Sequence, residues 1–196
     1  MQSRTPRAPQ QPAANRPDSR ADSRADSCAD VRAEIEARLT AELASVVAGA
    51  RRRALRDGDR QIDTAHLLHS VIETDPDVRA AFDGPPQVAR VLGYLVQRSI
   101  GYGLRWQGTV EDSGAVPVMC EAAGAAGVAG WSPAAVSAME GALERAASRG
   151  DQRACGLDLL AVLAADRDCR AVEVLQRAGV DTESLAGRLQ GESRQV

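Results

Sequence analysis

Apolar side chains recur at steps of three and four residues near the start of the folded part of the chain. Between residues 31 and 57 the apolar positions are Ile35, Leu39, Leu43, Val46, Val47, Ala50 and Leu55. That spacing places them on one face of an amphipathic helix. Thr40 has the side chain of a helix N-cap, which predicts a break near Leu39 and a new helix start there. Gly58 and Asp59 predict the end of this helix.

Further helical segments are expected before residue 101. An apolar helix opens at Thr64 and runs through Ile72, and the following Asp-Pro pair predicts its end. A short segment over 78–82 comes before a Gly-Pro-Pro run, and another helix is expected over 87–100. Strand-favouring residues are sparse and alanine is common, so the pattern favours an all-α protein.

The chain contains an internal repeat. A shift of 92 positions aligns residues 39–83 with residues 131–175 without a gap, and nine of the 45 pairs are identical. This composition would give about three or four identities by chance. Ser132 in the second copy keeps the N-cap chemistry of Thr40, and Pro133 suits the first helical position. The identical pairs are Ser45/Ser137, Gly49/Gly141, Ala50/Ala142, Arg53/Arg145, Ala54/Ala146, Gly58/Gly150, Asp59/Asp151, Leu67/Leu159 and Leu68/Leu160.

These patterns divide the chain into segments. The N-terminal residues are rich in Pro, Gln, Ser and Arg and include a Ser-Arg/Cys-Ala-Asp repeat, which predicts a disordered tail or, alternatively, a weak docking peptide. The segment between the copies has turn residues and scattered β-formers, which predict a loop or short hairpin. The expected organisation is a disordered tail at 1–30, a first repeat at 31–100, a linker at 101–130, a second repeat at 131–190 and a short tail at 191–196.

Composition narrows the possible chemistry. All 24 positive side chains are arginine, so a P-loop lysine and a Schiff-base lysine are both excluded. His66 and His69 are the only histidines; their spacing could share a metal, but no third ligand is in view, so a structural role for His66 is expected. The net charge of −3 and the aromatic content of 3% argue against a nucleic-acid surface. We therefore expect no enzyme activity, cofactor or metal.

The expected location is the cytoplasm. No apolar run approaches the roughly 18 residues of a membrane span, and no apolar stretch of a secretory signal follows the first arginines. The four cysteines have wide, unpatterned spacings and are expected to be reduced thiols, with disulfides as the alternative.

Several runs in the second copy carry a family resemblance. They are Trp131-Ser132-Pro133-Ala134-Ala135, Arg149-Gly150-Asp151, Cys155-Gly156-Leu157-Asp158-Leu159-Leu160-Ala161 and the stretch from Ala171 to Asp181. In the first copy, residues 63–69 keep a Thr, a His and a Leu-Leu pair. Over about residues 35–190 the chain resembles the Clp N-terminal (Clp repeat) domain, found at the front of Clp-type AAA+ unfoldases. Each family repeat has an aromatic-Thr-Pro-like start, a long helix ending near Gly-His, and then Gly-Thr-Glu-His-Leu-Leu-Leu.

The resemblance implies a fold and a set of candidate residues. It implies two pseudo-symmetric helical bundles in one domain, acting as a mobile module that receives substrates and adaptors. Some relatives bind phosphorylated arginine through the acidic residue of Gly-Thr-Glu-His, helped by the Thr at the repeat start. This sequence has no acid at the two acidic positions, so the charge-assisted contact to the guanidinium is missing. The candidate ligand- or partner-binding residues are the two repeat starts and those two positions: Leu39, Thr40, Trp131, Ser132, Ala65 and Leu157.

The expected function is protein binding. The sequence contains no ATPase motif up to Val196, so we expect a free-standing, non-catalytic module that binds substrates, adaptors or partners of the Clp machinery, as an adaptor or a decoy. The alternative is a protein that sequesters cyclic peptide antibiotics aimed at Clp unfoldases. Some relatives accept these antibiotics between the repeats, where Trp131 stands; Trp131 is either a hydrophobic staple alone or a staple that also contacts ligand. A third hypothesis is a regulatory scaffold that uses the tail and the linker.

Overall fold

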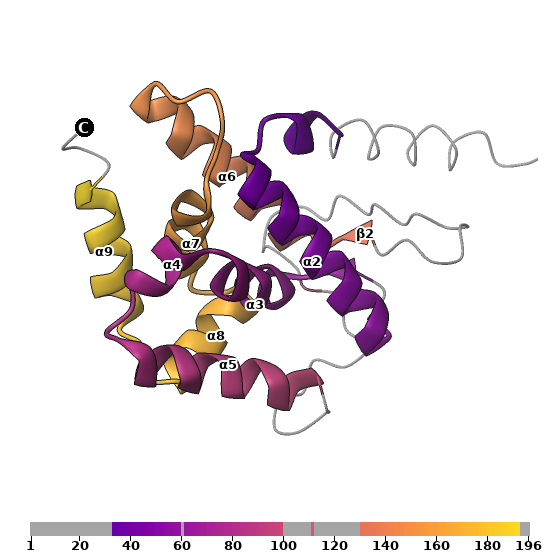
Figure 1. Ribbon diagram of the computed structural model, residues 1–196, viewed down its shortest axis with the longest axis vertical. Helices are drawn as coiled ribbons and strands as arrows, with labels where there is room; N and C mark the ends of the chain where they lie inside the picture. Colours follow the sequence, from indigo (N-terminus) through magenta and orange to yellow (C-terminus); the bar gives the residue numbers. More distant parts are fainter. Residues whose placement is uncertain (1–32, 60, 100–110, 112–129, 193–196) are drawn as a thin grey trace, which may run out of the picture.

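The computed structural model describes residues 33–59, 61–99, 111 and 130–192 (Figure 1). These residues are mostly helical, which confirms the predicted all-α class. The tail at 1–30, nearly all of the linker and residues 193–196 lie outside them. After a helical turn at 33–37, the elements are α2 (Ala41–Asp57), β1 (Gln61–Ile62), α3 (Thr64–Thr74), α4 (Pro76–Ala80), α5 (Pro85–Ser99), β2 (Gly130–Trp131), α6 (Pro133–Arg149), α7 (Gly156–Ala165), α8 (Arg170–Arg177) and α9 (Thr182–Glu192).

Helices α2 and α6 occupy equivalent places in the two sequence copies. Both are 17 residues long, and their first residues are the same 92 positions apart as the repeat. The Thr40 Oγ1 accepts from the backbone N–H of Leu43 at 3.2 Å, and the Ser132 Oγ accepts from that of Ala135 at 3.0 Å. The predicted N-caps are therefore confirmed. Each helix ends at a glycine with positive φ, 74° at residue 58 and 87° at residue 150, where an L side chain would be strained.

The second helix of each copy lies at the centre of the molecule. Figure 1 shows α3 with α2 on one side, α5 below it and α8 beside it, and these neighbours are in contact with it. Helix α7 is covered in the same way by α6 and α9, and α3 also contacts α7. The Leu-Leu pairs that match between the copies are fully buried: Leu67, Leu68, Leu159 and Leu160. The two copies thus share one continuous hydrophobic core.

The first two helices of each copy cross closely at a glycine. A Cβ placed on Gly49 would lie 3.2 Å from the Ser70 Oγ, and one placed on Gly141 would lie 3.1 Å from the Val162 Cγ1. These spaces leave little room for any side chain. Ser70 and Val162 are themselves equivalent in the repeat, so the two crossings have the same geometry.

Short parallel strand pairs join the copies to each other. Trp131 of β2 pairs with Ile62 of β1, and the Ser132 N–H donates to the Ile62 carbonyl at 2.8 Å. The counterpart contact is an isolated bridge between Leu39 and Ala154, beside which the Thr40 N–H donates to the Ala154 carbonyl at 3.0 Å. Each copy therefore begins on the loop that precedes the second helix of the other copy.

The prediction that Leu55 lies on the buried face of the first helix is wrong. Leu55 is 45% exposed, while the neighbouring Ala54 is fully buried. Residue 54 continues the buried set of Leu43, Val47 and Ala50 at helical spacing, and residue 55 turns outward. Within the described part of the chain, no helix is both long and apolar enough to cross a membrane.

Candidate functional site

The apolar residue at the start of each copy points into the protein. Leu39 and Trp131 are only 3% and 5% exposed, and both belong to the shared core. The Trp131 ring is packed in the shared core, and its backbone pairs with Ile62. Its indole Nε1 is buried and finds no hydrogen-bond partner among the described residues. The hydroxyls of Thr40 and Ser132 are engaged as N-caps.

Ala65 and Leu157, at the two positions where Clp repeats carry an acid, lie in apolar surroundings. Ala65 is fully buried in α3, and Leu157 is partly buried against the core. The nearest carboxylates on these helix starts belong to Asp63 and Asp158, and both already hold an arginine of this chain. Asp63 Oδ2 lies 2.7 Å from the Arg170 Nη1, and Asp158 Oδ2 accepts from the Arg149 Nη2 at 2.8 Å.

His66 closes the start of α3, as expected for a structural histidine. Its backbone N–H donates to the Asp63 Oδ1 at 2.9 Å, and its Nδ1 accepts from the Asp63 N–H at 3.2 Å. This reciprocal pair is a capping box. The equivalent residue in α7 is Asp158, whose carboxylate accepts from the Cys155 N–H at 3.1 Å. The same helix position therefore caps both helices with different chemistry.

Asp59, Asp63 and His66 each place one possible ligand atom within 4.8 Å of the others. Sequence spacing instead suggested His66 with His69, but the His69 Nε2 lies 3.2 Å from Glu73. The His66 Nε2 lies 3.2 Å from the Asp59 Oδ2, and its Nδ1 is used in the capping box. A cation at this cluster would compete with those bonds and would face the Arg170 guanidinium held by Asp63. The arrangement suits a helix cap better than a metal site.

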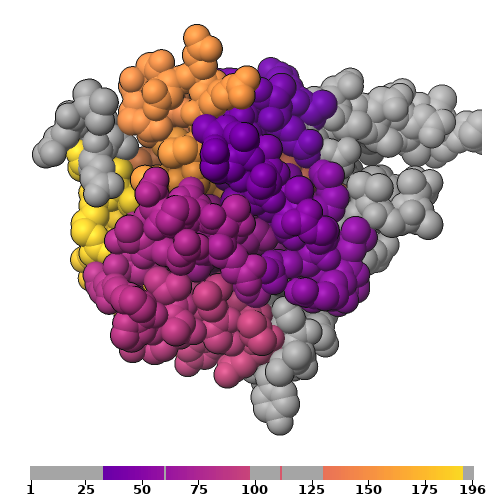
Figure 2. Space-filling model, in the orientation of Figure 1, coloured from indigo at the N-terminus to yellow at the C-terminus, as the bar shows by residue number. Residues whose placement is uncertain are grey.

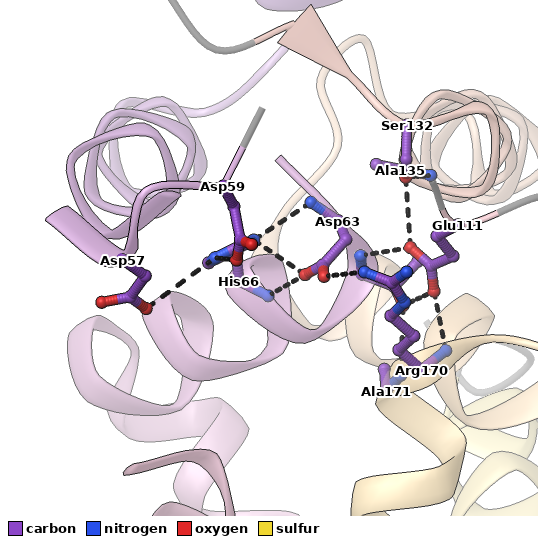
Figure 3. Close-up of polar contacts among 10 residues, drawn as sticks. Asp57, Asp59, Asp63, His66, Glu111, Ser132, Ala135, Arg170 and Ala171 are labelled. Atoms are coloured by element: carbon purple, nitrogen blue, oxygen red, sulfur yellow. Dashed lines mark hydrogen bonds and ion pairs between the residues drawn. The ribbon is translucent and has the colours of Figure 1, made fainter. Parts of the chain in front are cut away.

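The carboxyl group of Glu111, from the segment between the two copies, lies where α3, α6 and α8 begin. Glu111 is 4% exposed, and its Oε2 accepts from the Thr64 N–H at 2.8 Å and from the Ser132 Oγ at 3.1 Å. Its Oε1 accepts from the Arg170 N–H at 2.7 Å and from the Thr64 hydroxyl. Figure 3 shows the Glu111 carboxyl group between Ser132 at the start of α6 and the first residues of α8.

The sequence did not indicate Glu111. It stands in a segment without helical periodicity, and no spacing rule connects it to residues 47 and 59 positions away. Thr64 and Ser132 carried a signal as expected helix starts, but only as caps of their own helices. Both hydroxyls also accept while they donate to Glu111: Thr64 Oγ1 accepts from the Ala171 N–H of α8 at 3.1 Å, and Ser132 Oγ accepts from the Ala135 N–H of its own helix.

Electrostatic shifts concentrate around the start of α7. Burial alone would raise the pKa of Asp158, but hydrogen bonds from Arg149 and Cys155 outweigh it and lower that pKa. The same contact raises the pKa of Arg149. Burial raises the pKa of the Cys155 thiol, and it raises that of Cys169 to about 12. Both described cysteines are free, and neither environment produces the thiolate that a cysteine nucleophile needs.

A groove of about 510 Å³ lies between the first helical turn and α6. We call it the inter-repeat groove, because the turn at 33–37 belongs to the first repeat (31–100) and α6 belongs to the second. Figure 2 shows the indigo and orange surfaces of these two parts meeting at the top of the molecule. Its lining combines three glutamates and one arginine with apolar side chains: Glu34, Ile35, Arg38, Glu140, Leu143, Glu144 and Ala147.

Comparison of the chain with protein-family models and with curated proteins finds no match in either case.

Proposed function

We propose that this protein is a non-catalytic binding module of the Clp N-domain type, which docks substrates or adaptors of the Clp proteolysis machinery. The observation that carries the proposal is the exchange of repeat starts. Leu39 lies on the second copy and Trp131 on the first, so that two sequence repeats form one body related by an approximate two-fold. That arrangement fits the duplicated architecture that the sequence resemblance implies, and a rigid helical body is suited to presenting a surface.

The inter-repeat groove is the surface on which we place the partner. Its volume of about 510 Å³ falls in the range typical of ligand pockets. Glu34, Glu140 and Glu144 are exposed there, and Arg38 is the one basic side chain in the lining. The floor is apolar, because Ile35 and Leu143 are buried beneath the acids. We infer a partner segment that carries basic side chains beside an apolar one.

Phosphorylated arginine is not the feature that we expect this protein to recognise. The positions that would supply an acid hold Ala65 and Leu157, and the neighbouring Asp63 and Asp158 already hold Arg170 and Arg149. An incoming guanidinium would have to displace an internal one of equal charge. We therefore propose that binding depends on the groove and is indifferent to arginine phosphorylation.

The proposal is tested with purified components. Immobilised protein is incubated with a Clp unfoldase, its adaptors, and one substrate protein in arginine-phosphorylated and unmodified forms. We expect at least one of these to bind, equally in both forms where it is the substrate. The charge reversal Glu140→Arg should weaken binding at least about tenfold, since rim charges govern association. Glu42→Arg, at an exposed position of α2 outside the groove, is the matched control. No binding to any of these proteins would contradict the function, and an equal effect of both variants would contradict the groove.

The dimensions of the inter-repeat groove also support the second candidate, sequestration of cyclic peptide antibiotics. Calorimetry with such peptides separates the two functions, because a sequestering protein binds the peptide and ignores the Clp components. Trp131→Ala is a poor probe, since the ring is a core residue whose removal is expected to cost about 3–5 kcal/mol of stability. Glu144→Ala changes the groove at an exposed side chain instead. No heat of binding with the wild type would dismiss this candidate.

A further inference from the structure

Two arginines and a leucine form an exposed strip on the last turns of α2. Arg52, Leu55 and Arg56 are three and four residues apart, so their side chains are neighbours on one face of the helix. All three are exposed, and Leu55, at 45%, is one of two large apolar side chains that are exposed in the described part of the chain. We call these three residues the α2 strip.

The arginines of the α2 strip are available to a partner. The two other arginines of α2, at positions 51 and 53, form ion pairs with glutamates of the same chain. The Arg56 guanidinium lies 3.5 Å from its neighbour Asp57, but its side chain is 65% exposed. Arg52 forms no ion pair within the ranges that the structure describes. The strip therefore presents two positive charges to solvent, with an apolar side chain beside them.

The inter-repeat groove carries the same pattern with the opposite charge. Its α6 wall presents Glu140, Leu143 and Glu144, which read acid-x-x-Leu-acid, and the α2 strip reads Arg-x-x-Leu-Arg. On both helices the two charged residues are one turn apart, which places their Cβ atoms about 5–6 Å from each other. Both glutamates are exposed, and neither forms an ion pair with another described residue. The charges of the two surfaces therefore match in sign and in spacing.

The α2 strip does not fill the groove of its own molecule. None of its three residues lines that groove. Figure 1 shows α2 running from the top of the molecule to its lower right, and the strip belongs to its last turns, whereas the groove lies at the top (Figure 2). The complementary surface must therefore come from another molecule.

We propose that the inter-repeat groove of one copy receives the α2 strip of a second copy of this chain. The strip arginines lie opposite Glu140 and Glu144, and Leu55 covers the apolar floor of the groove. Because the strip and the groove are different surfaces, the contact is made head to tail. The inference rests on the groove assigned in the proposed function and adds its regulation, since a second copy competes with the partner segment for one surface.

The oligomeric state of the purified protein tests this contact. In sedimentation velocity at low salt, the average mass should rise as the protein concentration goes from micromolar to millimolar, and added salt should weaken the association. The strip variant combines Arg52→Glu with Arg56→Glu, and the groove variant combines Glu140→Arg with Glu144→Arg. Each should raise the Kd of self-association at least about tenfold, because the facing charges then repel. Arg167→Glu, at a side chain that is 76% exposed between α7 and α8, is the control and should leave the Kd unchanged.

An equimolar mixture of the two variants gives the decisive result. Each reversed surface then meets the opposite charge on the other variant, so association should return to nearly the wild-type Kd. Circular dichroism of each variant checks beforehand that its helix content is unchanged. The proposal is overturned if the wild type sediments as a single chain at every concentration, if the variants associate as the wild type does, or if their mixture does not associate.

The outcome is independent of the proposed function, because no Clp component is present in these measurements. Self-association without binding to any Clp component would leave this contact standing and remove the function. Binding to a Clp component without self-association would do the reverse.

Discussion

The contact between Arg149 and Asp158 gives the sharpest stability prediction. Asp158 is 1% exposed at the start of α7, and it accepts from the Arg149 guanidinium and from the Cys155 N–H. In Asp158→Asn the side chain keeps its shape but loses its charge. One of its two oxygens becomes an NH₂ group that faces the donors of Arg149. We expect the variant to fold with lower stability.

The magnitude follows from the burial of the two partners. Breaking a buried ion pair on one side costs about 3–5 kcal/mol. The lower end applies here, because Arg149 is partly exposed and keeps Asp151 at 2.9 Å as a second partner. We therefore expect a loss of about 3 kcal/mol in the free energy of unfolding at pH 7. In a chain of this size that corresponds to about 10 °C in the unfolding midpoint.

The same Arg149 provides the control. Asp151→Asn removes its other carboxylate, which is 56% exposed, and exposed pairs contribute only about 0–1 kcal/mol. Urea unfolding of wild type and both variants at pH 7 should therefore separate Asp158→Asn from Asp151→Asn by about 2–3 kcal/mol. Equal losses in the two variants would refute the reasoning, since burial would then not determine the strength of the contact.

The pH dependence of that difference has a defined sign. The folded pKa of Asp158 lies below its unfolded value, so in acid the unfolded chain takes up the proton first. The stabilisation is complete above the unfolded pKa of about 3.8 and disappears as the pH falls through the lower folded pKa. The gap between wild type and Asp158→Asn should thus persist at pH 5 and shrink below pH 3.8. A gap that did not change in acid would show that charge is not its origin.

Two further predictions concern helix packing and a buried histidine. Gly141→Ala should lower the free energy of unfolding, measured in urea, by about 1–2 kcal/mol, because the new Cβ would lie 3.1 Å from the Val162 Cγ1. Adding Val162→Ala to this variant should recover part of the loss. Strictly additive effects of the two substitutions would contradict the explanation. Burial and the nearby Arg53 lower the pKa of His69 to about 4. Between about pH 6.5 and pH 4 the unfolded chain therefore binds a proton at this histidine and the folded state does not. The free energy of unfolding should fall as the pH drops from 6.5 to 4. His69→Gln should reduce that slope; an unchanged slope would assign it to other groups.

Features set by local spacing could be predicted from the sequence. The three- and four-residue steps located α2 and α3, and side-chain chemistry identified Thr40 and Ser132 as caps. The offset of 92 predicted that α6 would repeat α2, and both helices have the same length. Leu55 was predicted on the buried face and is exposed. A helical turn of 3.6 residues does not decide which of two adjacent positions at the edge of a face is buried.

Features set by contacts between the copies could not be predicted in this way. Periodicity gives the face of a helix but does not say which other segment covers it. Nothing in the spacing indicated that Leu39 would pair with Ala154 of the other copy. Glu111 is the extreme case, since its importance depends on donors from three helix starts that only the folded chain brings together. The sequence thus indicated Ser132 as a cap and Thr64 as a helix start, but it indicated neither Arg170 nor the common acceptor Glu111.

The exchange of repeat starts explains why the start of α3 needs a buried acid. Because each copy begins on the loop before the other copy's second helix, the starts of α3 and α7 lie inside the molecule, where water does not satisfy their first N–H groups. An acid must lie there or the donors remain unpaired, at a cost of about 1–3 kcal/mol each. Glu111 meets this need at the start of α3, whereas Asp75 accepts from the N–H groups of Asp77 and Val78 at the start of its own α4. The duplicated body is therefore asymmetric at the sites that symmetry would make equal.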